Sequence, residues 1–223
     1  MNNKSTLDQI LKFYHGLDWA LATYSPLKDC KELPIVVGGD AAYLRMREKL
    51  GSGFRYFIEV CKNEFEKENV GRACEESRFS DDYTALFNDA DIYLPSPCNV
   101  TPLQLALQKL GYRSTNKKAV EQNGCMVFLN KTGNAHPVKV DVLVKTKHDH
   151  TRPKSGRAIE TILPQMKGKK QFGKFDEINN LSFITIKSVQ ERIDADIESC
   201  GDKVPVKMLQ DRLLLGKFLT EVA

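Results

Sequence analysis

The sequence contains no apolar run approaching the roughly 20 residues that a bilayer-spanning helix requires. Its first residues, MNNKSTLD, contain no apolar segment of the signal-peptide type, and no internal repeat or low-complexity stretch follows. No Cys-x-x-Cys pair occurs, and the six cysteines are spread along the chain. That spread favours reduced thiols over a disulfide framework or a zinc site. Together these absences predict a cytoplasmic protein that does not span a membrane.

The composition of the chain is that of a folded protein, with 41% hydrophobic and 28% charged residues in 223. Helical and strand periodicities alternate irregularly along the sequence, which predicts an α/β (α+β) fold with a mixed sheet rather than a regular series of βαβ units. We expect helices over 5–24, 40–50, 57–67, 102–110, 188–199 and 205–220, and strands over 33–37, 89–94, 125–130, 138–144 and 181–186. The strands over 125–130 and 138–144 are predicted to form a hairpin.

Two regions follow from this order. Residues 1–150 are expected to form the core, with a helical insertion at about 51–82 whose second half, 68–82, is a charged loop. Residues 151–223 are expected to contribute a basic segment, a strand and C-terminal helices that pack on the core.

The most informative residues are three aspartates on predicted strands. In the segment Asp-Ala-Asp-Ile-Tyr-Leu, strand alternation places Asp89 and Asp91 on one face and the apolar residues on the other. Asp141 lies within the valine-rich segment 138–144, on the same face of its strand as Lys139. Like charges held beside apolar strands are costly unless a cation compensates them. A hard ion that prefers oxygen ligands, such as Mg²⁺, is the cation that suits three carboxylates.

A pair of glycines precedes the predicted helix at 40–50. Gly38 and Gly39 follow the short apolar strand that ends at Val37. Glycines at such a place allow backbone amides to approach a phosphate closely, and the helix N-terminus adds positive potential. By itself this arrangement is also common in tight turns without a ligand.

Taken together, these motifs resemble the nucleotidyltransferase superfamily with the DNA polymerase β-like catalytic core. Its pattern is a strand, Gly-Gly or Gly-Ser at the head of a helix, Asp-x-Asp on the next strand, and a third Asp on a later strand. The matching residues here are Gly38-Gly39, Asp89-Ala90-Asp91 and Asp141. The region 188–219 also resembles the lysine-bearing helices that close toxin-type members of the superfamily.

The resemblance implies a definite chemistry. Asp89, Asp91 and Asp141 would bind two Mg²⁺ ions, and Asp141 would help to activate an acceptor hydroxyl. Gly38 and Gly39 would present amides to a nucleoside triphosphate (NTP). Lysines from three places, Lys139, Lys207 and Lys217, are candidates for phosphate contacts. The acceptor would be RNA, a protein side chain or a small molecule.

The sequence departs from the family pattern in two respects. Asp40 stands where the family usually has Ser or Thr, so its carboxylate either repels a triphosphate or caps the following helix. The interval from Gly39 to Asp89 is also much longer than is typical, which the insertion at 51–82 would explain.

A basic segment over 145–174 supports a different function. It carries nine Lys or Arg against two acidic residues, although the whole chain has a net charge of only +4. Such a segment either binds a polyanion or is simply a solvated loop. The alternative to an enzyme is therefore a catalytically inactive nucleotidyltransferase fold that binds nucleic acid or a protein partner, the latter by way of the insertion.

Overall fold

The computed structural model confirms an α/β fold with a mixed sheet. It describes residues 6–24, 32–69, 78–79, 89–115, 125–130, 137–144, 178–201 and 203–222. The basic segment and most of the 68–82 loop lie outside these residues. The elements are α1 (Thr6–Tyr24), β1 (Ile35–Val36), α2 (Gly39–Leu50), η1 (Gly51–Gly53), α3 (Phe54–Glu68), β2 (Asp89–Leu94), η3 (Pro97–Asn99), α4 (Val100–Lys109), β3 (Tyr112–Ser114), β4 (Cys125–Asn130), β5 (Lys139–Val144), β6 (Ser182–Phe183), α7 (Ile186–Cys200) and α8 (Val206–Glu221).

The sheet has six strands in the order β3-β4-β5-β2-β1-β6. Strand β2 is parallel to β5 and antiparallel to β1, while β1 is parallel to β6 and the predicted β4–β5 hairpin is antiparallel. The two aspartate-bearing strands, β2 and β5, are therefore direct neighbours in the middle of the sheet. Because the pair is parallel, residues paired in register point to the same face.

The core confirms the predicted alternation on these two strands. Ala90 and Ile92 of β2, and Val140 and Val142 of β5, are all completely buried. The side chains between them in sequence are less buried, which leaves the opposite face of the sheet available for polar groups. Tyr93 departs from this pattern, because its ring is buried although it lies on the aspartate face.

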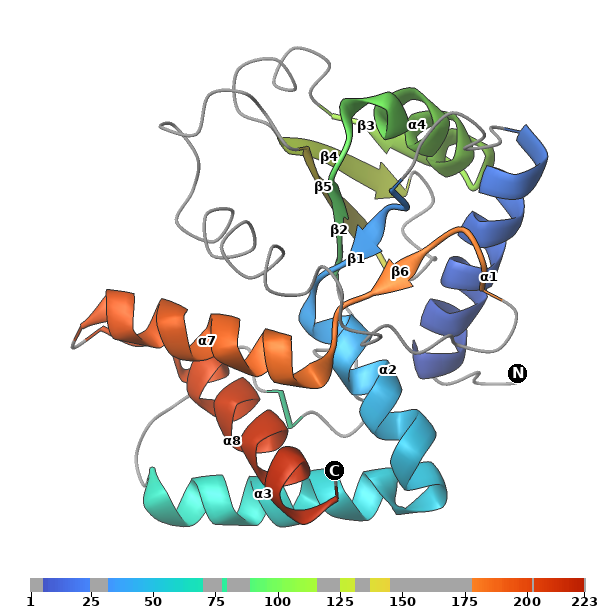
Figure 1. The fold of residues 1–223 in the computed structure, drawn as a ribbon. Coiled ribbons are helices and arrows are strands. Elements are labelled where there is room, and N and C mark those ends of the chain that lie inside the picture. Colours follow the sequence, from blue (N-terminus) through green and yellow to red (C-terminus); the bar gives the residue numbers. More distant parts are fainter. Residues whose placement is uncertain are drawn as a thin grey trace.

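The helices lie in two groups around the sheet (Figure 1). Helices α1 and α4 pack against each other beside the strands, whereas α2, α3, α7 and α8 gather beyond one end of the sheet. Helix α2 runs from the end of β1 into the second group, so its N-terminus lies next to the sheet and its C-terminus lies away from it.

Most predicted elements are present, with changes at their ends. Helix α4 begins at Val100 with Asn99 as its N-cap, not at Pro102 with a Thr101 cap, because η3 leads directly into the helix. Helix α3 begins at Phe54, since η1 joins it to α2 without a loop. The short strand β3 was not predicted, and β1 and β6 are shorter than expected.

Two expectations about the whole chain have outcomes here. No helix in the described part is long and apolar enough to cross a membrane. The expectation of reduced thiols is wrong for Cys98, which is disulfide-bonded, whereas Cys61 and Cys200 are free.

Candidate active site

Strand pairing brings the three predicted aspartates to one face of the sheet. Asp91 is paired in register with Asp141 across the parallel β2–β5 ladder, and Asp89 is paired with Lys139. The side chain of Asp89 is exposed, and those of Asp91 and Asp141 are partly exposed. Three carboxylates and one ammonium group therefore form a cluster on the face opposite the apolar core, and we call these four residues the carboxylate cluster.

Lys139 compensates part of the negative charge. Its Nζ lies 2.8 Å from Oδ2 of Asp141 and 3.6 Å from Oδ2 of Asp89. Burial opposes the charged form of Lys139, but the hydrogen bond to Asp141 and the nearby carboxylates outweigh it and raise the pKa of the ammonium group. Lys139, which the sequence suggested as a phosphate contact, thus lies among the carboxylates themselves.

Asp91 is the most perturbed member of the cluster. Its pKa is raised to about 6, mainly by burial and also by the charges of Asp89 and Asp141, although Arg192 and Lys139 act to lower it. The net effect shows that the cations present do not fully offset the cost of ionising Asp91. A site with this property favours an additional positive charge.

Gly38 lies directly against Asp91. The amide of Val37 donates to the carbonyl of Asp91 over 2.8 Å, which extends the β1–β2 ladder to the edge of the turn. Gly38 has φ −75° and ψ 174°, a conformation open to any residue. A Cβ at this position would nevertheless lie 3.0 Å from Oδ2 of Asp91 and 2.6 Å from Oδ1 of Asp40. Glycine is therefore required for space, not for its backbone angles.

Asp40 does not cap helix α2, and the expected capping role is wrong. The N-cap is Gly38, and Asp40 lies inside the first turn with only 2% of its surface exposed. Its Oδ2 accepts a hydrogen bond from the hydroxyl of Tyr14 in α1. The pKa of Asp40 is raised to about 7, mainly by burial and also by the charges of Asp91 and Asp89, although hydrogen bonds with Tyr14 and with the backbone of Ala41 act to lower it. Asp40 is thus a fourth carboxylate next to the cluster.

Arg192 of α7 is a site residue that the sequence did not reveal. Its Nη1 donates to the carbonyl of Val37 over 2.9 Å, and its charge lowers the pKa of Asp91. Arg192 therefore connects the C-terminal helices to the residue before the Gly38 turn. In the sequence it is one of several charged residues on an amphipathic helix, and no local pattern distinguishes it.

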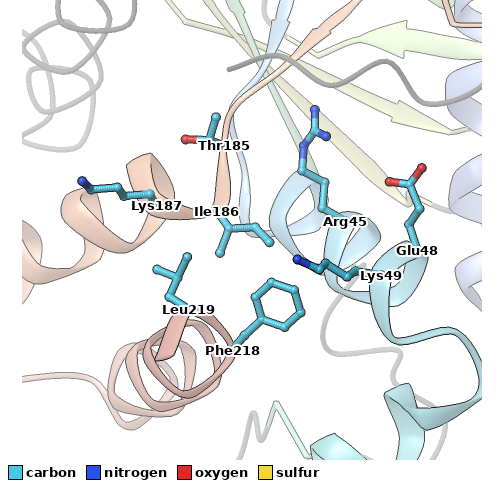
Figure 2. Close-up of a pocket in the computed structure, with 8 residues that line it drawn as sticks. All are labelled: Arg45, Glu48, Lys49, Thr185, Ile186, Lys187, Phe218 and Leu219. Carbon is cyan, nitrogen blue, oxygen red and sulfur yellow. The ribbon is translucent and has the colours of Figure 1, made fainter. Parts of the chain in front are cut away.

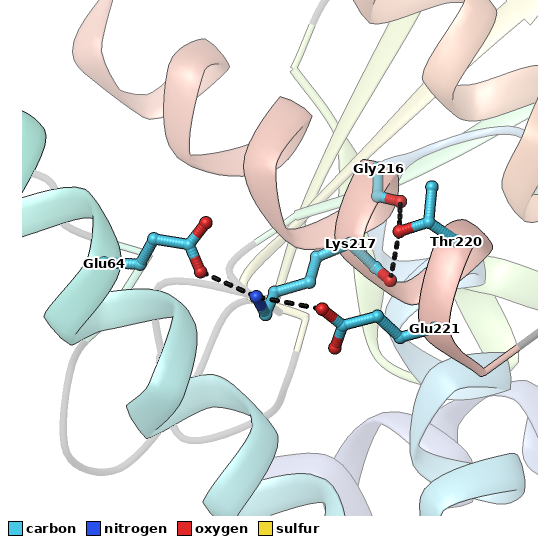
Figure 3. Close-up of polar contacts among 5 residues, drawn as sticks. All are labelled: Glu64, Gly216, Lys217, Thr220 and Glu221. Carbon is cyan, nitrogen blue, oxygen red and sulfur yellow. Dashed lines mark hydrogen bonds and ion pairs between the residues drawn. The ribbon is translucent and has the colours of Figure 1, made fainter.

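The two C-terminal lysines have different surroundings. Lys217 does not face the cluster, because its ammonium lies 2.7 Å from Glu64 of α3 and 3.0 Å from Glu221 of its own helix (Figure 3). This arrangement contradicts the expectation that Lys217 contacts phosphate. Lys207 is exposed in the first turn of α8, and the cations that act on Asp91 are Arg192 and Lys139 instead.

Two pockets of similar size lie in the helical part of the molecule. One, of about 540 Å³, lies between α2, the start of α7 and the end of α8, and Figure 2 shows its lining. The other, of about 560 Å³, lies between α3 and α8. Neither is lined by the carboxylate cluster. The cluster is therefore part of a sheet face and not of either of these pockets.

Within the described residues, no group of three or more His, Cys, Asp or Glu side chains is already arranged as a metal site. Comparison of the chain with protein-family models, with curated proteins and with solved structures gives no match. The resemblance to nucleotidyltransferases accordingly remains a prediction from the sequence motifs, and the carboxylate cluster is the structural feature that bears on function.

Proposed function

We propose that the protein is a metal-dependent nucleotidyltransferase that moves a nucleoside monophosphate from an NTP to a hydroxyl acceptor. The observation that carries this proposal is the pairing of Asp91 with Asp141 in register, with Asp89 on the same face and Gly38 against Asp91. The carboxylates on adjacent strands can bind a divalent cation, and the helix N-terminus beside them can bind phosphate.

The donor set fits Mg²⁺. Magnesium in nucleotide sites is usually bound by one or two carboxylates together with water and substrate phosphates, so a complete protein cage is not needed. Oδ1 of Asp141 is buried and has no hydrogen-bond partner among the residues that the structure describes, so it is available as a ligand. Asp89, Asp91 and Asp141 are the residues that would hold the ion. When bound, Mg²⁺ would neutralise developing charge on the phosphates and favour ionisation of the acceptor hydroxyl.

The protein's own groups would perform the remaining work. The backbone amides at the start of α2, at Gly38 and Gly39, would bind phosphate oxygens, and the helix dipole would favour their negative charge. Asp141 would accept the proton of the attacking hydroxyl. Lys139 would exchange its present carboxylate partners for the triphosphate, since an ammonium group on a flexible stem can change partners at small cost.

Lys139 is also the observation that favours the second candidate, a catalytically inactive binding module. The ammonium group of Lys139, 2.8 Å from Oδ2 of Asp141, can permanently take the place of a metal ion. In that case the cluster stabilises the sheet, and binding of nucleic acid or a protein partner takes place elsewhere on the surface.

Pyrophosphate release from each of the four NTPs, with RNA or the protein itself as acceptor, tests the leading proposal. We expect Mg²⁺-dependent release by the wild type and a loss of at least about 100-fold in Asp91→Asn and Asp141→Asn, because both remove a negative ligand without changing side-chain size. Glu59→Gln, an exposed substitution on α3, is the matched control. Undiminished release by Asp91→Asn would exclude the proposal.

Lys139→Gln separates the two candidates. If Lys139 is a substitute for a metal, its loss should lower the free energy of unfolding and Mg²⁺ should not restore it. If the cluster is built for metal, Mg²⁺ should stabilise Lys139→Gln at least as much as it stabilises the wild type.

A further inference from the structure

Asp40 and Asp91 are the two acidic groups at the Gly38 turn that have no salt bridge within the described part of the chain. The only ion pairs of Lys139 there are with the other two carboxylates, Asp89 and Asp141. Asp40 is 2% exposed and Asp91 is partly exposed. A buried carboxylate without a cation is costly, so this pair of groups requires an explanation beyond the folding of the sheet.

The two side chains are directed at the same space. The point where a Cβ of Gly38 would lie is 2.6 Å from Oδ1 of Asp40 and 3.0 Å from Oδ2 of Asp91. Oδ1 of Asp40 is buried and has no hydrogen-bond partner in the described ranges. The absent side chain of Gly38 therefore leaves a small space bordered by an unsatisfied carboxylate oxygen from α2 and a second carboxylate oxygen from β2.

Tyr14 fixes the orientation of Asp40 in this arrangement. Its hydroxyl donates to Oδ2, which leaves Oδ1 as the oxygen that faces Gly38 and Asp91. Residues that bind metal ions are commonly oriented by such an outer hydrogen bond to the atom that is not a ligand. Tyr14 itself is completely buried, so its hydroxyl has no alternative partner in solvent.

We propose that Asp40 and Asp91 form a divalent-cation site beside Gly38, in which a hard ion such as Mg²⁺ or Mn²⁺ is bound by Oδ1 of Asp40 and Oδ2 of Asp91. The proposal deepens the proposed function, and it rests on that function for the role of the ion with a nucleotide. It makes Asp40, which was otherwise expected to repel a triphosphate, a ligand of the metal ion. A divalent cation between the two carboxylates would neutralise their combined charge of −2, so the turn would no longer repel the phosphates.

The surrounding charges are compatible with one additional ion. Lys139 pairs with Asp89 and Asp141, and Arg192 donates to the carbonyl of Val37, so neither cation forms an ion pair with Asp40 or Asp91 in the described part of the chain. The existing cations therefore do not satisfy both groups. Oxygen ligands with this deficit suit Mg²⁺ or Mn²⁺, whereas no sulfur or imidazole ligand is involved.

Binding of Mn²⁺ to the whole chain without nucleotide tests the site, with free Mn²⁺ measured by electron paramagnetic resonance at pH 8. We expect Asp40→Asn to weaken binding by at least about 10-fold, and Tyr14→Phe to weaken it less, because Tyr14 only orients the ligand. Gly38→Ala should also weaken binding by at least about 10-fold, since its methyl group fills the space. Gly39→Ala is the steric control, because its Cβ would make only ordinary contact, at 3.4 Å, with Tyr43.

The outcomes distinguish this inference from the proposed function. Equal Mn²⁺ affinity in wild type, Asp40→Asn and Gly38→Ala would overturn the Asp40 site, and a loss in Asp141→Asn alone would then leave the proposed function intact. Weaker binding in Asp40→Asn without pyrophosphate release by the wild type would support the cation site and reject the transferase. No Mn²⁺ binding by the wild type would overturn the site. Circular dichroism of each variant establishes that the chain is folded.

Discussion

Two buried tyrosine–aspartate pairs, each with one member on helix α2, have the same chemistry but different surroundings. Tyr14 donates to Asp40 near the sheet, and Tyr43 donates to Asp211 among the C-terminal helices. Asp40 and Asp211 are almost equally buried, at 2% and 7% exposure. Asp211, however, also binds Arg78, whose Nε lies 2.9 Å from Oδ1 and whose Nη2 donates to Oδ2 over 3.1 Å.

The difference separates a structural acid from an acid available to a ligand. In the helical region the charge of Asp211 is neutralised by a two-point contact with a guanidinium, which suits a role in holding α8. Next to the sheet, Asp40 has a hydrogen bond but no cation within the described residues. A fold that compensates one buried carboxylate and leaves an equivalent one uncompensated favours a functional role for the second.

The largest effect is expected from breaking the compensated pair. Arg78→Met should lower the free energy of unfolding by about 3–5 kcal/mol, because it leaves the charge of Asp211 buried without a partner. Arg212→Met is the matched control, since Arg212 binds Asp194 over 3.0 Å with both side chains more than a third exposed, and should cost less than about 1 kcal/mol. Urea denaturation measures both variants. Equal losses in the two variants would show that Asp211 does not depend on Arg78.

In the Tyr14–Asp40 pair, which has no cation within the described residues, removing the charge should raise the free energy of unfolding at pH 8. The pKa of Asp40 is about 7 in the folded protein against an ordinary value of 3.8, so the folded state binds more protons between these values and stability falls as pH rises. Asp40→Asn removes this penalty and keeps an acceptor for Tyr14. We expect it to exceed the wild type in stability at pH 8, by on the order of 2–4 kcal/mol, and to match it near pH 4.

Urea denaturation at the two pH values tests this expectation, and Asp211→Asn is the comparison variant. Asp211→Asn should be less stable than the wild type at pH 8, because Arg78 loses its anion. A loss of stability in Asp40→Asn at pH 8 would mean that Asp40 is structural. Mg²⁺ should stabilise the wild type at pH 8 more than it stabilises Asp40→Asn.

Removing the tyrosine hydroxyls should change the free energy of unfolding by smaller amounts, and by different amounts in the two pairs. Tyr14→Phe removes the hydroxyl hydrogen bond to Asp40 and should cost about 1–3 kcal/mol, the range for hydrogen bonds to charged groups. Tyr43→Phe should cost less, about 1 kcal/mol, because Arg78 continues to satisfy Asp211. Chemical denaturation at pH 8 measures the difference between the two variants. A larger loss for Tyr43→Phe would contradict this assignment of roles.

The smallest effect is expected at Lys217. Its ammonium is bound by Glu64 of α3 and by Glu221 of its own helix α8 (Figure 3). Lys217→Gln should therefore leave the rate of pyrophosphate release within about twofold of the wild type, while Lys139→Gln reduces it clearly. A 10-fold loss in Lys217→Gln would indicate that Lys217 leaves its two glutamates to contact the nucleotide.

Local sequence patterns determined the main elements and the faces of the central strands. The alternation in 89–94 and 139–144 predicted which residues are buried and which carry the carboxylates, because strand periodicity places alternate side chains on opposite faces. Helical periodicity likewise predicted α1, α2, α7 and α8 to within a few residues. These features depend on residues close together in the chain, so the sequence alone is sufficient to find them.

Only the tertiary structure decided which charges are compensated. Tyr14 reaches Asp40 across 26 residues and Arg192 reaches Val37 across 155, so no local pattern contains either contact. The interpretation of Asp40 as a helix cap failed for the same reason, since its burial under α1 results from helix packing. Compensation of a buried charge depends on which distant groups share its surroundings, and packing alone brings those groups together.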